Sequence, residues 1–349
     1  MPATKPQNGE HTKKRLPFYR VLLPWKGDGK KLILYKTVCL IAVCIFLGCA
    51  LYLVWDLVVL PAAADTEQQD IKSVYYAESS ETPGTGDDSP ASSAPPERDG
   101  QGRLVRFLEL QKINPSIVGW IKVPGTVIDL PVLQADAKNP EFYLTHDYRD
   151  RYSGYGSVFA DAHCSVEKGK SRSIVLYGHS LNSGRMFTQL DRYKSLDFYK
   201  KNPVFTFDTI DSQSQWKVIS VFLTNTLPEQ GKPFNYMKTD FQDDSDFLNF
   251  VYQMRIRSLY STGVGFNKDD SIVLLSTCSY EFKDFREVVV ARKVRDGENS
   301  EVDVSRASYN GKTVYPDCWY TKNGGKKPVW PDTYEEAFKK NLLSWGEGI

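Results

Sequence analysis

Apolar and polar residues divide this chain into segments of different character. Residues 37–60 are almost wholly apolar, and a run of that length spans the ~30 Å core of a bilayer as a helix. Residues 78–102 are dominated by Ser, Pro, Gly, Asp and Glu, a composition that buries too little apolar surface to order itself. We therefore expect a basic segment at 1–36, a membrane span at 37–60, a flexible linker at 61–103, a folded domain at 104–295 and a C-terminal extension of unknown role at 296–349.

Short β-rich runs, separated by turn signals, recur through the folded domain. They cover residues 118–123, 127–133, 157–160, 173–177, 204–207, 216–223, 272–276 and 286–294. Because strong helices are few between them, this spacing predicts a mostly β domain, either a barrel or a sandwich.

Three segments show helical spacing instead. Apolar residues at 104–113 predict a short helix at the start of the domain, ended by Asn114-Pro115. A second helix is expected at 244–260, inside the long insertion before the strand at 272–276, because Asp243 and its neighbours form a start signal. In the extension, an apolar stripe suits a helix that docks on the domain. The stripe consists of Tyr334, Phe338, Leu342 and Trp345.

Charge gives the expected membrane topology. Residues 1–36 carry nine Lys and Arg against Glu10 and Asp28, so the N-terminus should stay in the cytoplasm and the domain should lie outside. A cleaved signal peptide is the alternative, since 62–64 are three alanines, but the apolar run is longer than a usual signal core. The net charge of +1 gives no reason to expect nucleic acid as a partner.

Three of the six cysteines lie in the expected span, and Cys164, Cys278 and Cys318 lie outside it. An odd number means that at least one of these three thiols is unpaired within the chain. A disulfide between Cys164 and Cys318 would pin the extension to the domain, and two free thiols are the alternative.

Cys278 follows the buried run at 272–276 and precedes a polar loop, so the sheet would hold its backbone while the thiol faces a substrate. A lone cysteine is more often a small buried hydrophobe. Ser276 and Thr277 precede it, and their hydroxyls either shape a substrate pocket or satisfy backbone groups.

A nucleophilic cysteine needs a proton-transfer partner. His179 ends the buried run at 173–177 as Cys278 ends its own, whereas His146 and His163 lie in polar, loop-like contexts. His11 precedes the span and is excluded by the expected topology.

An arginine completes the candidate site. Arg286 opens the strand after the Cys278 loop, and antiparallel pairing would return it beside Cys278, where its donors could stabilise an oxyanion. Arg292 lies six residues further on, ~20 Å away along the strand, and is expected to be structural.

In combination, several motifs resemble those of the sortase transpeptidases. They are Leu-Ser-Thr-Cys at 275–278, Arg-Glu-Val-Val-Val-Ala at 286–291, Tyr-Gly-His-Ser at 177–180, Gly-Arg-Met-Phe at 184–187, Gly-Trp-Ile at 119–121, Thr-Val-Ile-Asp-Leu-Pro-Val at 126–132 and Gly-Ser-Val-Phe at 156–159. The resemblance covers roughly 104–295, and the N-terminal and inserted helices resemble class B. It implies a closed β-barrel with an N-terminal helix and a helix inserted in the loop before the cysteine strand.

The resemblance also implies a chemistry. Cys278 would attack a sorting motif in an exported protein, His179 would protonate the leaving amine, and Arg286 would stabilise the intermediate. An amine of a peptidoglycan precursor or cross-bridge would then resolve the thioester at the outer face of the cell membrane. Neither metal nor cofactor is expected, because the acidic residues at 243–246 lack the spacing of a calcium loop.

Three alternatives stay open. A pilin-polymerising enzyme would use the same chemistry with a lysine acceptor, and a wall-directed cysteine protease would resolve the thioester with water. A non-catalytic binding module that retains the fold is a third class.

Overall fold

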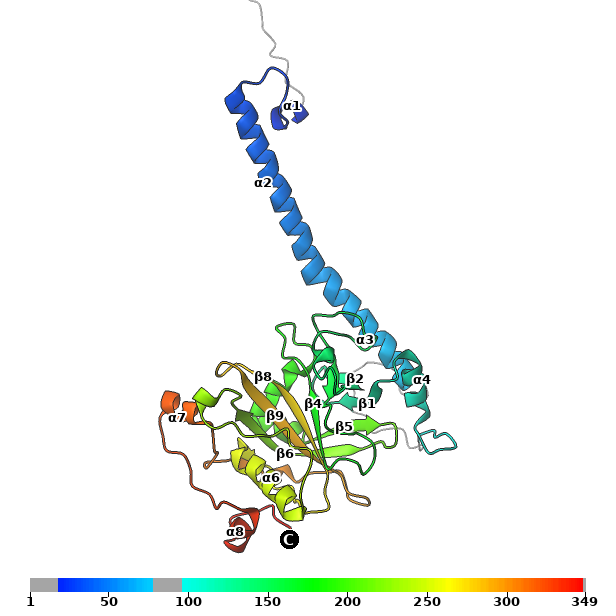
Figure 1. Ribbon diagram of the computed structural model, residues 1–349, viewed down its shortest axis with the longest axis vertical. Coiled ribbons are helices and arrows are strands. Elements are labelled where there is room, and N and C mark those ends of the chain that lie inside the picture. The colour runs from blue at the N-terminus through cyan, green and yellow to red at the C-terminus, as the bar shows by residue number, and fades with distance from the viewer. Residues whose placement is uncertain (1–17, 78–95, 348–349) are drawn as a thin grey trace, which may run out of the picture. The chain divides into compact units, whose positions relative to one another are not determined.

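The computed structural model describes residues 18–77 and 96–347 of the chain, in two compact units (Figure 1). The first unit, up to Gln69, contains α1 (Phe18–Leu22), α2 (Lys30–Val54), a π-helical turn (Trp55–Val59) and the start of α3 (Leu60–Tyr76). Among the described residues one helix, Lys30–Tyr76, is long and apolar enough to cross a membrane. The expected basic segment lies partly in 1–17, outside the described residues.

The expected flexible linker at 61–103 is wrong for residues 61–76, which continue the helix. The last turns of α3 belong to the second unit and pack on it: Ile71 and Tyr75 are buried. The Tyr75 ring stacks on Trp120 at 4.2 Å, and its hydroxyl donates a hydrogen bond of 2.7 Å to Asp208. The polar composition of the expected linker gave no sign of this contact, because the contact depends on only two aromatic residues, Tyr75 and Trp120. Residues 78–95 of the expected linker lie outside the described part of the chain.

Eight strands close into a barrel in the order β1-β2-β3-β4-β8-β9-β6-β5. They are β1 (Ile117–Lys122), β2 (Asp129–Gln134), β3 (Val158–Ala160), β4 (Ser173–Tyr177), β5 (Val204–Thr209), β6 (Gln215–Thr224), β8 (Ile272–Ser279) and β9 (Phe285–Lys293). β2 with β3 and β4 with β8 are parallel pairs, and the other neighbours are antiparallel. The eight predicted strands are confirmed. The alternation of apolar and polar residues along the strands cannot distinguish a barrel from a sandwich, and the pairing of β1 with β5 closes the sheet into a barrel.

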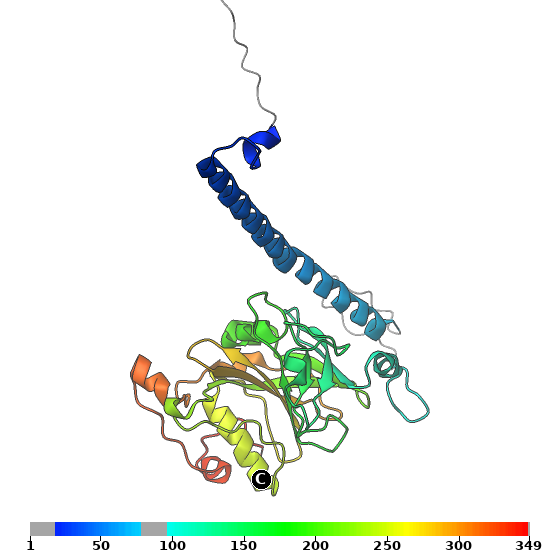
Figure 2. The ribbon, with the colours of Figure 1, turned by 45° about the horizontal axis from the view of Figure 1, so that its top comes forward.

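Alternate residues of the central strands serve two cores. Val273 and Leu275 of β8 join the core inside the barrel, whereas Ile272 and Leu274 face outward into a second core. This second core is covered by α6 (Asp244–Arg257), which lies outside the sheet in Figures 1 and 2. Both faces of β8 are therefore apolar, which explains its continuous hydrophobic sequence.

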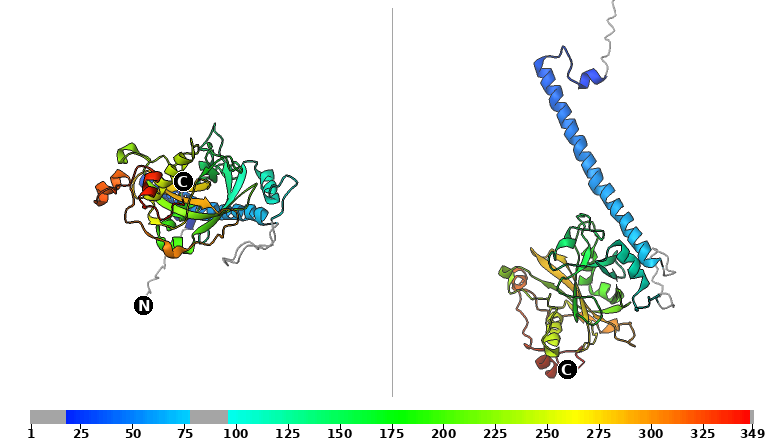
Figure 3. Two further views of the ribbon diagram at one scale, coloured as in Figure 1. Left: turned by 90° about the horizontal axis from the view of Figure 1, so that it is seen from below. Right: turned by 45° about the vertical axis from the view of Figure 1, so that its right-hand side comes forward.

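Helices outside the barrel confirm the expected fold class. α4 (Val105–Ile113) is the N-terminal helix and lies on the outer face of β1 (Figure 3). α6 is the helix inserted before the cysteine strand, and the Asp243 side chain caps it by accepting from the Asp246 amide at 2.8 Å. The remaining short elements are α5 (Leu196–Lys201), two-residue strands β7 (Tyr260–Ser261) and β10 (Ser308–Tyr309), and 3-10 turns η2 (Phe142–Leu144), η3 (Phe187–Lys194), η4 (Pro228–Gln230) and η5 (Val304–Arg306).

The C-terminal extension docks on the same side of the barrel as α6 (Figures 1 and 2). It contains α7 (Asp317–Asn323) and α8 (Tyr334–Lys339). The docking is as predicted, since Tyr334 and Trp345 are buried in the outer core. The helix is shorter than the predicted stripe, because the chain leaves it after Lys339, and Leu342 is exposed.

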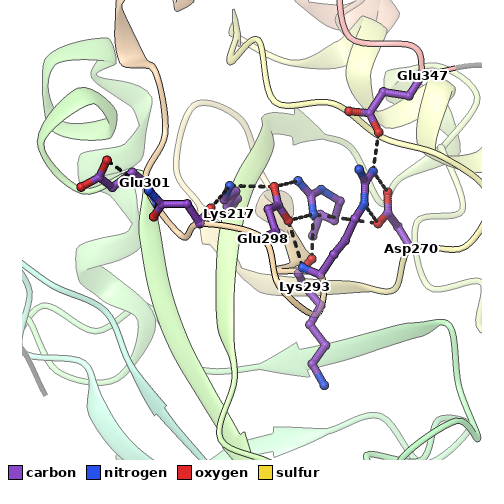
Figure 4. Close-up of polar contacts among 9 residues, drawn as sticks. Lys217, Asp270, Lys293, Glu298, Glu301 and Glu347 are labelled. Carbon is purple, nitrogen blue, oxygen red and sulfur yellow. Dashed lines mark hydrogen bonds and ion pairs between the residues drawn. The ribbon is translucent and has the colours of Figure 1, made fainter. Parts of the chain in front are cut away.

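A charged cluster joins the extension to one end of the barrel (Figure 4). Arg292, which is 1% exposed, makes a bidentate pair with Glu298 at 2.7 and 2.8 Å, and Lys217 donates to the same carboxylate at 2.7 Å. Arg295 binds both Asp270 and Glu347. Arg292 is therefore buried in ion pairs, as its predicted structural role requires.

Candidate active site

The ends of β4 and β8 bring His179 and Cys278 side by side. These strands are parallel neighbours, with Tyr177 opposite Ser276, and the Gly178 amide extends the ladder to the Ser276 carbonyl at 3.3 Å. His179 and Cys278 each follow the paired residues by two positions. Because side chains alternate along strands, both point to the same outward face.

Arg286 lies directly across from Cys278 on the antiparallel strand β9. Directly opposed residues have Cβ atoms about 5 Å apart, within reach of a long side chain. The guanidinium Nη1 donates to the Phe285 carbonyl at 3.1 Å, and Cys278, His179 and Arg286 are all half-buried. Cys278 and Arg286 are thus cross-strand neighbours, and His179 follows the end of the strand next to them, with all three side chains partly exposed.

The His179 ring is oriented by a backbone carbonyl. Its Nε2 lies 2.7 Å from the carbonyl oxygen of Leu144, in η2. A carbonyl only accepts, so Nε2 carries the proton of this bond and the neutral ring keeps its lone pair on Nδ1. The histidine is therefore held in one tautomer by a neutral group.

Gly156 supports that carbonyl. Its φ is +61°, a conformation that favours glycine, and a Cβ there would lie 2.7 Å from the carbonyl oxygens of both Leu144 and Tyr143. Sequence analysis did not single out Leu144, since a carbonyl leaves no mark in residue identity. Gly156 was noted only as part of a motif.

Gly178 and Thr277 fix the strand ends to each other. A Cβ on Gly178 would lie 2.6 Å from the Phe187 ring, so the close approach of this ring requires glycine at position 178. The Thr277 hydroxyl donates to the Gly178 carbonyl at 2.8 Å. The residues preceding His179 and Cys278 are therefore hydrogen bonded together beneath the site.

The side chains expected to bind substrate, Ser276 and Thr277, are both buried, at 1% and 3% exposure. The Ser276 hydroxyl lies 2.9 Å from the Tyr236 hydroxyl, and that of Thr277 bonds Gly178 as described. Buried and internally paired, both hydroxyls favour the structural alternative raised by the sequence.

Tyr236 is a site residue that sequence analysis missed. It precedes α6 in the insertion, is 5% exposed, and interacts electrostatically with Arg286 and Cys278. Burial raises the pKa of its hydroxyl, so the group stays protonated where it meets the Ser276 hydroxyl. No short motif marks a tyrosine in a long insertion, and only the folding of that insertion over β8 brings it here.

A buried charge network lies beneath the same strand ends. Lys194, at the end of η3, contacts Asp191, Glu281 and Glu287. Glu287 is 1% exposed on the barrel side of β9, and burial raises the pKa of its carboxyl group to about 8 despite the nearby lysine. Glu281 lies in the loop between Cys278 and Arg286, so Lys194 ties that loop to the segment after His179.

The other candidate residues lie elsewhere. The His146 ring stacks on Phe142 at 3.8 Å, and its Nδ1 is 2.8 Å from the Phe142 carbonyl. The exposed His163 ring lies 2.9 Å from an Asp161 carboxylate oxygen. Of the two possibilities for Cys164 and Cys318, the structure has the free thiols, and these two described residues form no disulfide. The described residues contain no group of three or more His, Cys, Asp or Glu placed to hold a metal ion.

The sequence and the closed eight-stranded barrel of this chain match known proteins. The Sortase domain family model matches residues 121–294. The chain is 34% identical over 192 residues to Sortase B of Staphylococcus aureus (strain NCTC 8325 / PS 47), covering 54% of this chain and 75% of that protein. It is 31% identical over 177 residues to Sortase B of Listeria monocytogenes serovar 1/2a (strain ATCC BAA-679 / EGD-e), covering 51% and 68%.

A solved structure agrees with these sequence matches. The Staphylococcus aureus sortase B–substrate complex superposes with a TM-score of 0.53 at 29% identity, covering 66% of this chain and 94% of that one. The chain belongs to the sortase family, and it is therefore a transpeptidase. Within the family it is most similar to class B, as its sequence motifs and inserted helix predicted.

Proposed function

We propose that this protein is a membrane-anchored cysteine transpeptidase that cleaves a sorting motif in exported proteins and joins them to a cell-wall amine. The observation that carries the proposal is the shared face of His179 and Cys278 at adjacent strand ends, with Arg286 across from the cysteine. A substrate complex exists for the similar Staphylococcus aureus sortase B, which supports a peptide substrate for this chain.

The proposed reaction has two displacements at one carbonyl carbon. The Cys278 thiolate attacks the scissile carbonyl, and the guanidinium of Arg286 stabilises the oxyanion. Imidazolium at His179 gives its proton to the departing amine as the C–N bond breaks, leaving a thioester. The acceptor amine then attacks, neutral His179 takes its proton, and the thiolate leaves as the new amide forms.

The hydrogen bond to the Leu144 carbonyl determines which ring nitrogen of His179 exchanges the catalytic proton. Because Nε2 is committed to the Leu144 carbonyl, Nδ1 gives and takes the proton in both displacements. Unlike a carboxylate, the carbonyl carries no full charge, so it acts on the ring by orienting it through this hydrogen bond.

The apolar helix Lys30–Tyr76 supports the anchoring part of the proposal. In this proposal the basic residues before it keep the N-terminus in the cytoplasm and the barrel outside. The enzyme then acts at the outer face of the cell membrane, where exported proteins and wall precursors meet.

The experiment is a transpeptidation screen with the full-length protein in detergent, pairing candidate sorting peptides with wall-type amines, lysine side chains and water. Amide products with a wall-type amine, lost in Cys278→Ala and His179→Ala but kept in His163→Ala, are expected. Products with lysine alone would indicate the pilin alternative, and hydrolysis unaffected by every amine would indicate a protease.

A thiol-reactive probe tests the nucleophile separately. Burial raises the pKa of Cys164 to about 11, and burial also raises the pKa of Cys318, so both thiols should label slowly at neutral pH. Cys278 is expected to label fastest of the three. Equal labelling of all three, with wall anchoring intact in Cys278→Ala, would favour a non-catalytic binding module.

A further inference from the structure

A pocket lies between the insertion and the C-terminal extension, outside the catalytic edge. Its volume is about 520 Å³, within the usual range of ligand sites. The lining residues that matter below are Lys232, Phe234, Lys238, Gln253, Arg257 and Lys327. The lining combines apolar walls with four basic side chains and two carboxylates.

The pocket continues toward the active site. A smaller neighbouring hollow shares Lys232, Phe234, Arg257 and Lys327 with it and extends to Thr224. Thr224 is the cross-strand neighbour of Arg286 on β6. The smaller hollow therefore ends at the buried residue that pairs with Arg286 across the sheet.

The extension lines one side of the smaller hollow. Tyr315 lines the smaller hollow and stacks on Trp319 at 4.2 Å. Trp319 lies 6.2 Å from Phe282, and the Lys322 ammonium lies over the same ring at 4.6 Å. Phe282 belongs to the loop that joins Cys278 to Arg286. The extension therefore belongs to the surroundings of the site.

Arg257 is the residue that points to a ligand. Its Nη1 donates to the carbonyl and the side-chain oxygen of Gln253, at 2.8 and 2.7 Å, and its guanidinium lies over Phe234. No carboxylate pairs with it among the described residues. Burial lowers the pKa of Arg257 to about 10, so its charge is held at a desolvation cost that an anion would offset.

Lys232 adds a second positive charge to the pocket that Arg257 lines. Lys232 is exposed and has no ion-pair partner in the described part of the chain, whereas Lys238 pairs with Asp246 and Lys327 with Asp317. Arg257 and Lys232 together offer a bidentate fork and a mobile charge above apolar walls. That combination suits an acidic peptide side chain, whose stem packs on Phe234 while its carboxylate meets the guanidinium.

We propose that the C-terminal extension completes a subsite in which Arg257 and Lys232 bind a carboxylate-bearing peptide segment of the transpeptidation substrates. This inference rests on the proposed function for its substrates, but the binding itself does not need turnover. The carboxylate comes either from the sorting peptide beyond the scissile bond or from a peptide that carries the acceptor amine.

Binding is measured first, by ligand-observed NMR on the full-length Cys278→Ala protein in detergent. The probes are N-acetylglutamate amide and its neutral counterpart N-acetylglutamine amide. The acidic probe should bind about tenfold more tightly, the size of one charge-assisted hydrogen bond. Arg257→Gln and Lys232→Gln should each reduce this preference, whereas Lys112→Gln on α4 should leave it unchanged.

Kinetics then identify the source of the carboxylate. Sorting peptides and amine acceptors are compared with Glu or Gln at one flanking position, in the wild type and in Lys232→Gln. If the Glu version of one substrate has a lower KM than its Gln version, that substrate carries the bound carboxylate. The difference in KM should disappear in Lys232→Gln, while kcat stays unchanged.

Equal binding of the two probes to the wild type, or a preference that survives both substitutions, would overturn the subsite. Failure of the proposed function would look different, because the acidic probe would still bind while no arm of the kinetic assay gave product.

Discussion

The Nε2 of His179 lies 2.7 Å from the carbonyl oxygen of Leu144, thirty-five residues away in the sequence. This contact joins the segment between β2 and β3 to the end of β4, and it fixes the tautomer of the candidate catalytic base. A backbone carbonyl cannot be removed by substitution, so its role has to be tested through the residue that holds it in place.

Gly156→Ala should lower kcat by about tenfold or more, because a displacement near 1 Å in a catalytic contact carries such a cost. The new methyl group would meet the Leu144 carbonyl, at a φ that alanine disfavours. Gly154→Ala is the matched control, since a Cβ there would meet nothing within 4 Å. Steady-state kinetics beside thermal unfolding separate the two effects; unchanged kcat in a folded Gly156→Ala would contradict the orienting role.

Two arginines on β9 should respond in opposite ways. Arg286→Ala should reduce kcat/KM by about 10²–10³, the usual cost of losing an oxyanion donor, with little effect on stability. Arg292→Lys should keep most turnover but lower the melting temperature, because lysine cannot form the bidentate pair with Glu298. Turnover surviving in Arg286→Ala would remove that residue from the mechanism.

Acid sensitivity should originate partly at Glu298. Hydrogen bonds from Arg292, and then from Lys217, hold the pKa of this carboxyl group well below its usual 4.5. A depressed folded pKa gives stability that is present above about pH 4.5 and lost as pH falls toward the folded value. Glu298→Gln should therefore cost about 3 kcal/mol or more at pH 7, by leaving Arg292 buried without its partner, and less at pH 3.

The neighbouring Glu301 provides the control for this measurement. Glu301 is exposed, and its carboxylate accepts a hydrogen bond of 3.3 Å from the Asn299 side chain (Figure 4). Denaturant unfolding between pH 3 and pH 7 should show no comparable change in Glu301→Gln. Equal stability losses for Glu298→Gln at both pH values would contradict the assignment.

Glu287 should have the opposite pH dependence. Burial raises the pKa of this carboxyl from 4.5 to about 8, so between these values the folded protein keeps a proton that the unfolded chain releases. Wild-type stability should fall over this range as pH rises. Glu287→Gln has no proton to release, so relative to the wild type it should gain about 1–3 kcal/mol between pH 5 and pH 8, measured by urea unfolding.

The end of α3 should contribute to the stability of the barrel. Tyr75→Ala removes the stacking on Trp120, the hydrogen bond to Asp208 and the support of the Arg106 guanidinium, which lies 4.4 Å from the Tyr75 ring centre. We expect a loss of about 3 kcal/mol, comparable to other buried aromatic deletions. Tyr152→Ala, at an 81% exposed position, should change little. An unaffected melting temperature in Tyr75→Ala would restore the linker interpretation for this segment.

Sequence reasoning predicted most of the fold because its signals are local. The β-rich runs, the Asp243 start signal of α6 and the glycine before His179 each act within a few residues. The segment before the barrel was misread for the opposite reason: its polar composition outweighed Tyr75 and Ile71, whose importance depends on distant partners. The predicted helix of the extension is longer than the one observed, because apolar residues beyond Lys339 pack on the domain without continuing the helix.

The sequence by itself determined the membrane-length apolar run, the strands, and the placement of Cys278, His179 and Arg286 at strand ends, because side-chain periodicity and turn residues are written locally. The tertiary structure decided what surrounds those three residues. Parallel pairing of β4 with β8 sets His179 beside Cys278, a carbonyl orients the imidazole, and the insertion brings Tyr236 to the site. These contacts depend on the register of strands far apart in the sequence and on backbone atoms, and neither can be inferred from residue types.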